Sequence, residues 1–280
     1  MKKHKKRRIY RQFFRLIFFL ILLFFITFFL AGGFYFFSPR TWQHVGDFLP
    51  KLEAVLPANQ QTDPPKKIST TDRLSRMLFI KRAVDARIDR NHYVKLRDIP
   101  EDMQNAIIAV EDNRFYSHYG FDVQGIMRAT LVNLQYGEVT EGASTITQQL
   151  VKNLFLSHEQ SFGRKAEELL LSLDMEANYS KSEILELYLN TIYYGSNFYG
   201  IGPAAEGYFN KRPQDLKLPE AAMLAGTPNA PSLYSPYVDF MLAKKRQFIV
   251  IDAMVRNGYI DETTAESAKI KPLYLAEPAE

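Results

Sequence analysis

Two glutamates stand where a carboxylate could act on a substrate. Glu111 closes a run of apolar residues with helical spacing, and a turn-like stretch with His118 and Gly120 follows it. A carboxylate at a helix end beside a loop is well placed for general-base chemistry, although such a residue is more often a solvated helix end. His118 has no second metal ligand at useful spacing, so we interpret it as holding the turn by hydrogen bonds.

Glu168 is the second candidate, on a segment predicted to be helical over residues 164–177. It shares the apolar stripe of Leu171 and Met175, one turn from Arg164 and Lys165. An acid on an apolar face is costly unless it is paired. Two interpretations are therefore open, an ordinary ion pair along the helix or a residue that faces a cleft, and we favour the cleft.

A third segment, over residues 145–155, predicts a helix with an N-cap at Ser144. One side of this helix is apolar, and the opposite side carries Thr145, Gln148, Gln149 and Lys152. Two amides, a hydroxyl and one cation suit a ligand rich in hydroxyl and phosphate groups. An ordinary solvent-exposed face is the alternative.

The elements that must position these residues are mostly helices. Further helices are predicted over 122–134, from a capping box at Ser180 and Glu183 to Tyr193, over 203–209, 218–224 and 239–256, and from Asp261 onward. Short strands are expected only near Met77–Ile80 and His92–Leu96. The pattern therefore predicts a mainly α domain.

The N-terminal region differs sharply from this body. Eight of the 35 basic residues lie in residues 1–15, and the other 265 residues carry 27 bases against 31 acids, a formal charge of −4. Residues 16–37 contain no charge, which is long enough for a membrane-spanning helix. Bases before such a span favour a cytoplasmic N-terminus, and this explains the basic run better than a nucleic-acid-binding arm does.

These features predict four regions: a cytoplasmic tail (1–15), a transmembrane anchor (16–37), a Pro-containing linker (38–70) and a domain outside the cytoplasm (71–280). The chain has no Cys, which excludes disulfides, thiolate metal sites and a Cys nucleophile.

Five segments in order along the chain strongly resemble the motifs of the peptidoglycan glycosyltransferases, glycosyltransferase family 51. The matches are Glu111–Asp122 to ED-x-x-F-x-x-H-x-G-x-D, Gly142–Asn153 to G-x-S-T-I-T-Q-Q-x-x-K-N, Arg164–Glu168 to R-K-x-x-E, Lys181–Asn190 to K-x-x-I-L-E-x-Y-L-N, and Ala221–Pro231 to the last motif. The resemblance extends more loosely over residues 70–260.

The resemblance implies a lysozyme-like, mainly α fold with two lobes and a long cleft near the membrane. It implies that the GlcNAc 4-hydroxyl of lipid II attacks C1 of the lipid-linked glycan, with inversion and release of undecaprenyl pyrophosphate. Lipid II, the lipid-linked glycan, the membrane and other cell-wall synthesis proteins are the expected partners, and nucleic acid is not. No metal site or required cofactor is indicated, although Mg²⁺ could accompany the pyrophosphate.

The resemblance also gives roles to individual residues. Glu111 is the expected base, and Glu168 matches a second essential glutamate beside the donor. The expected substrate-binding residues are Lys152, Arg164, Lys165, Ser144, Thr145, Gln148, Gln149 and, as a weaker candidate for contact with the donor, Arg128. The chain departs from many members at Gln160, where they have Arg.

Two other functions compete with this one: a muramidase or lytic transglycosylase of the same broad fold, and a non-catalytic scaffold. The polar face of residues 145–152 argues against the first, and the presence of both glutamates argues against the second. With neither S-x-x-K nor K-T-G in the sequence, we expect a monofunctional enzyme without a transpeptidase.

Overall fold

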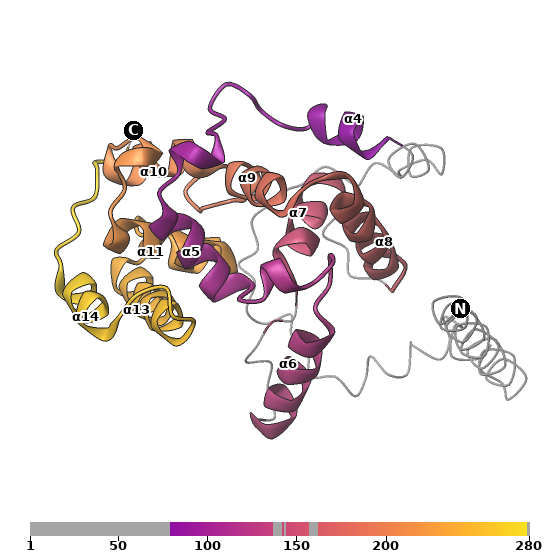
Figure 1. Ribbon diagram of the computed structural model, residues 1–280. Helices are drawn as coiled ribbons and strands as arrows, with labels where there is room; N and C mark the ends of the chain where they lie inside the picture. The colour runs from indigo at the N-terminus through magenta and orange to yellow at the C-terminus, as the bar shows by residue number, and fades with distance from the viewer. Residues whose placement is uncertain (1–78, 137–141, 143, 157–161, 279–280) are drawn as a thin grey trace, which may run out of the picture. The chain divides into compact units, whose positions relative to one another are not determined.

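The computed structural model describes residues 79–136, 142, 144–156 and 162–278 (Figure 1). The predicted tail, anchor and linker, and Gln160, lie outside these residues, so the four regions stay predictions. Among the residues described, none of the helices combines the length and the apolar character needed to cross a membrane.

The described chain is mainly α, as the sequence pattern predicts. Its longer helices are α4 (Ile80–Asp85), α5 (Glu101–Glu111), α6 (Val123–Tyr136), α7 (Ile146–Phe155), α8 (Phe162–Asn178), α9 (Lys181–Thr191), α10 (Ile201–Phe209), α11 (Leu218–Gly226), α12 (Pro231–Tyr234), α13 (Phe240–Arg256) and α14 (Glu262–Ile270). Single 3₁₀ turns cover Leu96–Asp98, Phe115–Ser117, Pro213–Asp215 and Thr227–Asn229.

The two expected strands are wrong as far as the structure describes them. Ile80 begins α4, and the segment before Leu96 is extended but pairs with no strand. Its backbone is bound by a side chain instead: the Val94 N–H donates to Asn190 Oδ1 and the Val94 carbonyl accepts from Asn190 Nδ2, both at 2.8 Å. An amide on α9 thus takes the place of a neighbouring strand.

Polar caps set the ends of several helices. The N-cap of α7 is Thr145 and not Ser144, because Thr145 forms a full capping box with Gln148. The predicted box of Ser180 and Glu183 at the start of α9 is confirmed. Asp239 and Asp261 cap α13 and α14. The sequence pattern predicted helices that start at these two positions.

The helices form two packed groups (Figure 1). In one group, α5, α11 and α13 pack on each other and α14 packs on α13. In the other, α7 packs on both α8 and α9, and α4 packs on α8. Helix α10 contacts both α9 and α11, and one apolar core runs through both groups. Hydrogen bonds join the C-terminal end of α5 to the N-terminal part of α7, from Ile146 to Asp112 and from Gln149 to Glu111.

Candidate active site

Glu111 is the last residue of α5, and its side chain is only 8% exposed. Its Oε2 accepts a hydrogen bond from Gln149 Nε2 on α7 at 2.8 Å. Arg246 on α13 places Nη2 3.9 Å from Oε1. Oε1 is buried and accepts no hydrogen bond from any described residue.

The surroundings of Glu111 make its carboxylate more basic. Burial raises the pKa of Glu111, and the nearby charge of Asp112 raises it further, while the Gln149 hydrogen bond and Arg246 lower it. Burial is the largest of these effects, because removing a carboxylate from water disfavours its charged form. A general base is most effective when its pKa lies near the working pH, so a raised pKa makes this carboxylate better suited to the role.

Asp112, next to Glu111, holds the following turn in place. Its Oδ2 accepts the Ile146 N–H at the start of α7 at 3.0 Å and lies 2.9 Å from His118 Nε2. The Thr145 hydroxyl donates to the Gly120 carbonyl at 2.7 Å. Gly120 has a φ of +74°, and a Cβ there would lie 3.0 Å from the Ser172 backbone, so only glycine fits. The interpretation of His118 as a structural residue is confirmed.

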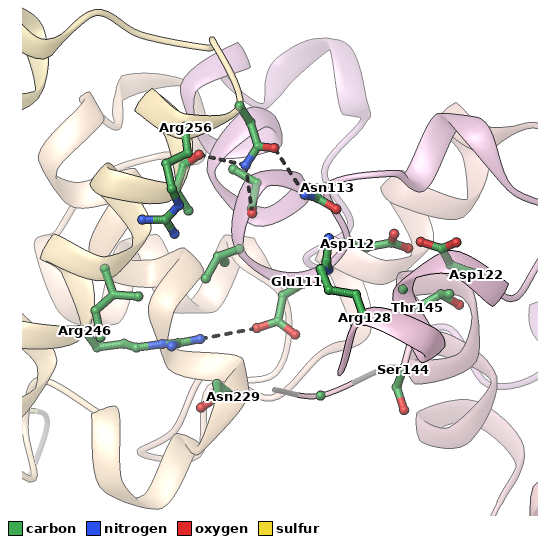
Figure 2. Close-up of a pocket in the computed structure, with 17 residues that line it drawn as sticks. Glu111, Asp112, Asn113, Asp122, Arg128, Ser144, Thr145, Asn229, Arg246 and Arg256 are labelled. Carbon is green, nitrogen blue, oxygen red and sulfur yellow. Dashed lines mark hydrogen bonds and ion pairs between the residues drawn. The ribbon is translucent and has the colours of Figure 1, made fainter. Parts of the chain in front are cut away.

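A cavity of about 500 Å³ opens on one side of Glu111. Figure 2 shows Arg246 pointing toward Glu111 from α13, with Arg128 of α6 across the cavity. Arg256, also on α13, is a third cation in the lining. Asn257 ties this wall together, since its side chain accepts from Asn113 at 3.2 Å and donates to the Ala253 carbonyl at 2.8 Å. Three carboxylates, Glu111, Asp112 and Asp122, share this lining with the three arginines, so its formal charges balance.

A second cavity of about 270 Å³ opens on the other side of Glu111. Its polar lining includes Gln149, Lys152 and Glu168, so the structure brings these three predicted residues together. The two cavities share Val110, Glu111, Gly142, Ser144 and Asn229 in their linings. Glu111 therefore lies where two ligand-sized spaces meet.

Glu168 combines the two interpretations that the sequence left open. It lines the second cavity, and it also pairs with both cations of its own helix. Its Oε2 lies 3.2 Å from Arg164 Nη1, and its Oε1 forms an ion pair with Lys165. Arg164 and Lys165 are thus held by Glu168, and among the described residues neither contributes to the lining of either cavity.

Thr145 and Gln148 are engaged within the protein. Both are buried, and the Gln148 Oε1 accepts the Thr145 N–H at 3.1 Å while the Thr145 Oγ1 accepts the Gln148 N–H at 3.1 Å. Gln148 nevertheless lines the second cavity together with Gln149 and Lys152, and Thr145 lines the first. Ser144 is exposed and borders both spaces.

Four residues of the site were not predicted: Arg246, Arg256, Asn229 and Tyr188. The two arginines lie in a helix whose periodicity showed only its apolar face, so their approach to Glu111 needed the packing of α13 on α5. Asn229 and Tyr188 lie within two of the five family motifs, and this resemblance was the signal in the sequence that could have identified them. Tyr188 is fully buried, and its hydroxyl donates to Gln149 Oε1 at 3.0 Å.

Comparison with known proteins identifies related sequences. Residues 80–255 match a family described as "Transglycosylase". Penicillin-binding protein 1A of Neisseria flavescens is 50% identical over 171 residues, which is 61% of this chain and 21% of that protein. Penicillin-binding protein 1A of Vibrio cholerae is 39% identical over 241 residues, 86% of this chain and 27% of that protein.

The chain thus spans between a fifth and about a quarter of the length of these relatives. Among solved structures, penicillin-binding protein 1A from Haemophilus influenzae aligns with a TM-score of 0.41 and 24% identity, over 66% of this chain and 18% of that one.

Proposed function

The chain belongs to the transglycosylase family, whose members are glycosyltransferases of peptidoglycan synthesis, and we propose that it polymerises lipid II into glycan strands. The 4-hydroxyl oxygen of the terminal GlcNAc of lipid II bonds to C1 of the lipid-linked MurNAc. The bond from C1 to the pyrophosphate oxygen breaks, and the anomeric centre inverts from α to β. The hydroxyl proton passes to Glu111, and undecaprenyl pyrophosphate leaves.

The position of Glu111 between the two cavities carries this proposal. A transfer between two large ligands needs a base that both can reach, with one ligand on each side. We assign proton acceptance to Oε1 of Glu111, which is buried and accepts no hydrogen bond from a described residue, since Oε2 is occupied by Gln149. A sugar hydroxyl is a weak nucleophile at neutral pH, so a base with a raised pKa suits the step.

We assign the cavity with Lys152 and Glu168 to the donor and the larger cavity to lipid II. Charge develops on the departing pyrophosphate, so donors and cations beside it lower the barrier. Lys152 is the cation of the donor side, and Gln149 and Ser144 are its hydrogen-bonding groups. Arg164 and Lys165 act through Glu168, which they hold at the cavity wall. Arg128, Arg246 and Arg256 line the acceptor side.

Thr145 and Gln148 contribute through their backbone and their position rather than as free side-chain ligands. Their capping box orients the first turn of α7, and the N-terminus of a helix favours negative charge. This helix end borders both cavities through Ser144 and Thr145. The sugars and phosphates of the substrate would thus contact the N-terminus of α7, which the capping box holds in place.

No resident cofactor is part of the proposal. Both oxygens of Glu168 are engaged by cations, which leaves this carboxylate poorly suited to bind a metal. Among the described residues, no cluster of three or more His, Asp or Glu is placed to hold one. Any Mg²⁺ would arrive with the pyrophosphate of the substrate, and adding or chelating Mg²⁺ in the polymerisation assay tests this.

The cellular setting follows from the substrate. We propose a single-pass bacterial membrane protein with its N-terminus in the cytoplasm and the lysozyme-like, two-lobed catalytic domain outside. One face of α6 exposes Val123, Ile126, Met127 and Leu131, an apolar row at helical spacing that supports contact with a membrane. The monofunctional assignment, and partnership with other cell-wall synthesis proteins, stay predictions.

The deciding experiment incubates the purified full chain in detergent with lipid II and separates the products by gel electrophoresis. Glycan polymer is the expected product. Absence of polymer together with degradation of isolated peptidoglycan would favour the muramidase instead. Absence of both activities in a folded protein would favour the scaffold.

A further inference from the structure

A chain of two hydrogen bonds connects α9 to Glu111 through α7. The Tyr188 hydroxyl donates to Gln149 Oε1 at 3.0 Å, and Gln149 Nε2 donates to Glu111 Oε2 at 2.8 Å. We propose that Tyr188 is a positioning residue for the base: its hydroxyl fixes the Gln149 amide in the one orientation that presents N–H to Glu111. The proposal rests on the function proposed above, in which Glu111 accepts the proton.

The chemistry of an amide explains why Gln149 needs such a partner. A glutamine side chain ends in one acceptor and one donor group, and a half-turn about its last bond exchanges them. In the exchanged orientation the Gln149 oxygen would face the Glu111 carboxylate, and two acceptors repel each other. A tyrosine hydroxyl that donates to the amide oxygen stabilises the other orientation.

Burial makes this control effective. Tyr188 is fully buried, so no solvent competes for its hydroxyl. Burial, and then the charge of Glu111, raise the pKa of Tyr188 well above its usual value, so the phenol stays protonated and remains a donor. A donor that never ionises at working pH gives Gln149 a fixed partner.

The orientation of Gln149 affects the pKa of Glu111. The Gln149 hydrogen bond lowers the pKa of Glu111 and opposes the effect of burial. Arg246 on α13 also lowers this pKa, and the neighbouring Asp112 raises it. Asp122, Arg128 and Arg256 line the first cavity with Glu111. Lys152 on α7 and Glu168 on α8 line the same cavity. Loss of an oriented Gln149 would leave Arg246 as the main group opposing protonation.

The test is Tyr188→Phe in the full chain, with Tyr194→Phe as the matched control. Tyr194 is equally buried, but its hydroxyl makes no hydrogen bond with any described residue. We expect Tyr188→Phe to lower kcat for lipid II polymerisation roughly tenfold near neutral pH, the effect of about one hydrogen bond. KM should change little, and the acid limb of the kcat–pH profile should move to higher pH. Tyr194→Phe should leave both unchanged.

A double-mutant cycle separates positioning from simple packing. If Tyr188 acts through Gln149, then Tyr188→Phe combined with Gln149→Ala should be no slower than Gln149→Ala alone. Additive losses of kcat would overturn the proposal, because they would show that Tyr188 acts independently of the amide. An unshifted acid limb in Tyr188→Phe would overturn it as well.

A measurement without substrate distinguishes this proposal from the proposed function. The Glu111 carboxyl can be titrated by ¹³C NMR with labelled glutamate, assigned by its loss in Glu111→Gln. We expect a higher pKa of Glu111 in Tyr188→Phe than in the wild type and in Tyr194→Phe. If wild-type protein forms no polymer yet this shift is seen, the function fails and the positioning stands. If polymer forms and no shift is seen, the positioning fails.

Discussion

Glu111 and Glu168 are both buried carboxylates that line the same cavity, and they differ in their partners. Glu111 receives one amide hydrogen bond, has an arginine 3.9 Å away and keeps one oxygen without a hydrogen bond. Glu168 has both oxygens in ion pairs, with Arg164 and Lys165. A carboxylate that must take up a proton needs an oxygen without a hydrogen bond and a weakly compensated charge, whereas one that organises cations needs neither.

The largest expected effect is on turnover in Glu111→Gln. The amide has nearly the same shape and can still accept from Gln149, but it cannot take up a proton. We expect lipid II polymerisation to fall by roughly 10²–10⁴-fold, the usual contribution of a general base. Circular dichroism should show an unchanged helical fold. A folded Glu111→Gln protein with normal turnover would remove Glu111 from the mechanism.

Thermal or urea unfolding should show opposite changes in stability for substitutions of the two glutamates. Glu168→Gln leaves Arg164 and Lys165 facing an amide, and we expect a loss of about 1–3 kcal/mol of stability at neutral pH. Glu111→Gln removes a poorly compensated buried charge, so its unfolding free energy should rise. Equal destabilisation by both substitutions would contradict the comparison.

The stability gain in Glu111→Gln should depend on pH with a definite sign. The pKa of Glu111 is raised in the folded state, so between the unfolded and folded pKa values the native protein binds more protons than the unfolded chain. Wild-type stability therefore falls as pH rises through that window. The difference between variant and wild type should be largest above the window, shrink as pH falls through it, and be smallest below pH 4.5, the ordinary pKa of a glutamate.

A smaller effect is expected from Lys152→Ala. Lys152 is exposed at the donor side of the site, so its loss should barely change stability. It should reduce kcat/KM for lipid II about tenfold, because one cation beside the developing pyrophosphate charge is lost. Lys217→Ala, an exposed lysine outside both cavity linings, is the control. An unchanged kcat/KM would remove Lys152 from donor binding.

The smallest expected effect concerns Arg246→Gln. Arg246 lowers the pKa of Glu111 from 3.9 Å, so its removal should raise that pKa and shift the acid limb of the kcat–pH profile upward. Turnover should fall on the acid side and approach the wild-type value at higher pH. A uniform loss at every pH would indicate substrate binding by Arg246 instead.

The sequence predicted local structure well where local rules decide it. Helical spacing and caps located α5, α9, α13 and α14 to within a few residues, because periodicity and capping are properties of neighbouring residues. It failed at His92–Leu96, where Asn190, almost a hundred residues away, binds the extended backbone. It also missed Thr145 as the cap of α7, since Ser144 and Thr145 are equally suitable by residue type.

The candidate site divides in the same way. The sequence alone identified the motifs and their order, and these include Glu111, Gln149, Lys152 and Glu168. It also identified the family. Which of these residues face a cavity was decided by packing. The pairing of Glu168 with Arg164 and Lys165 lies within α8 at i,i+4 and i,i+3, and the sequence already offered it. The approach of Arg246 to Glu111 and the link from Tyr188 to Gln149 each join different helices. Such contacts depend on how helices pack, which no short-range pattern encodes.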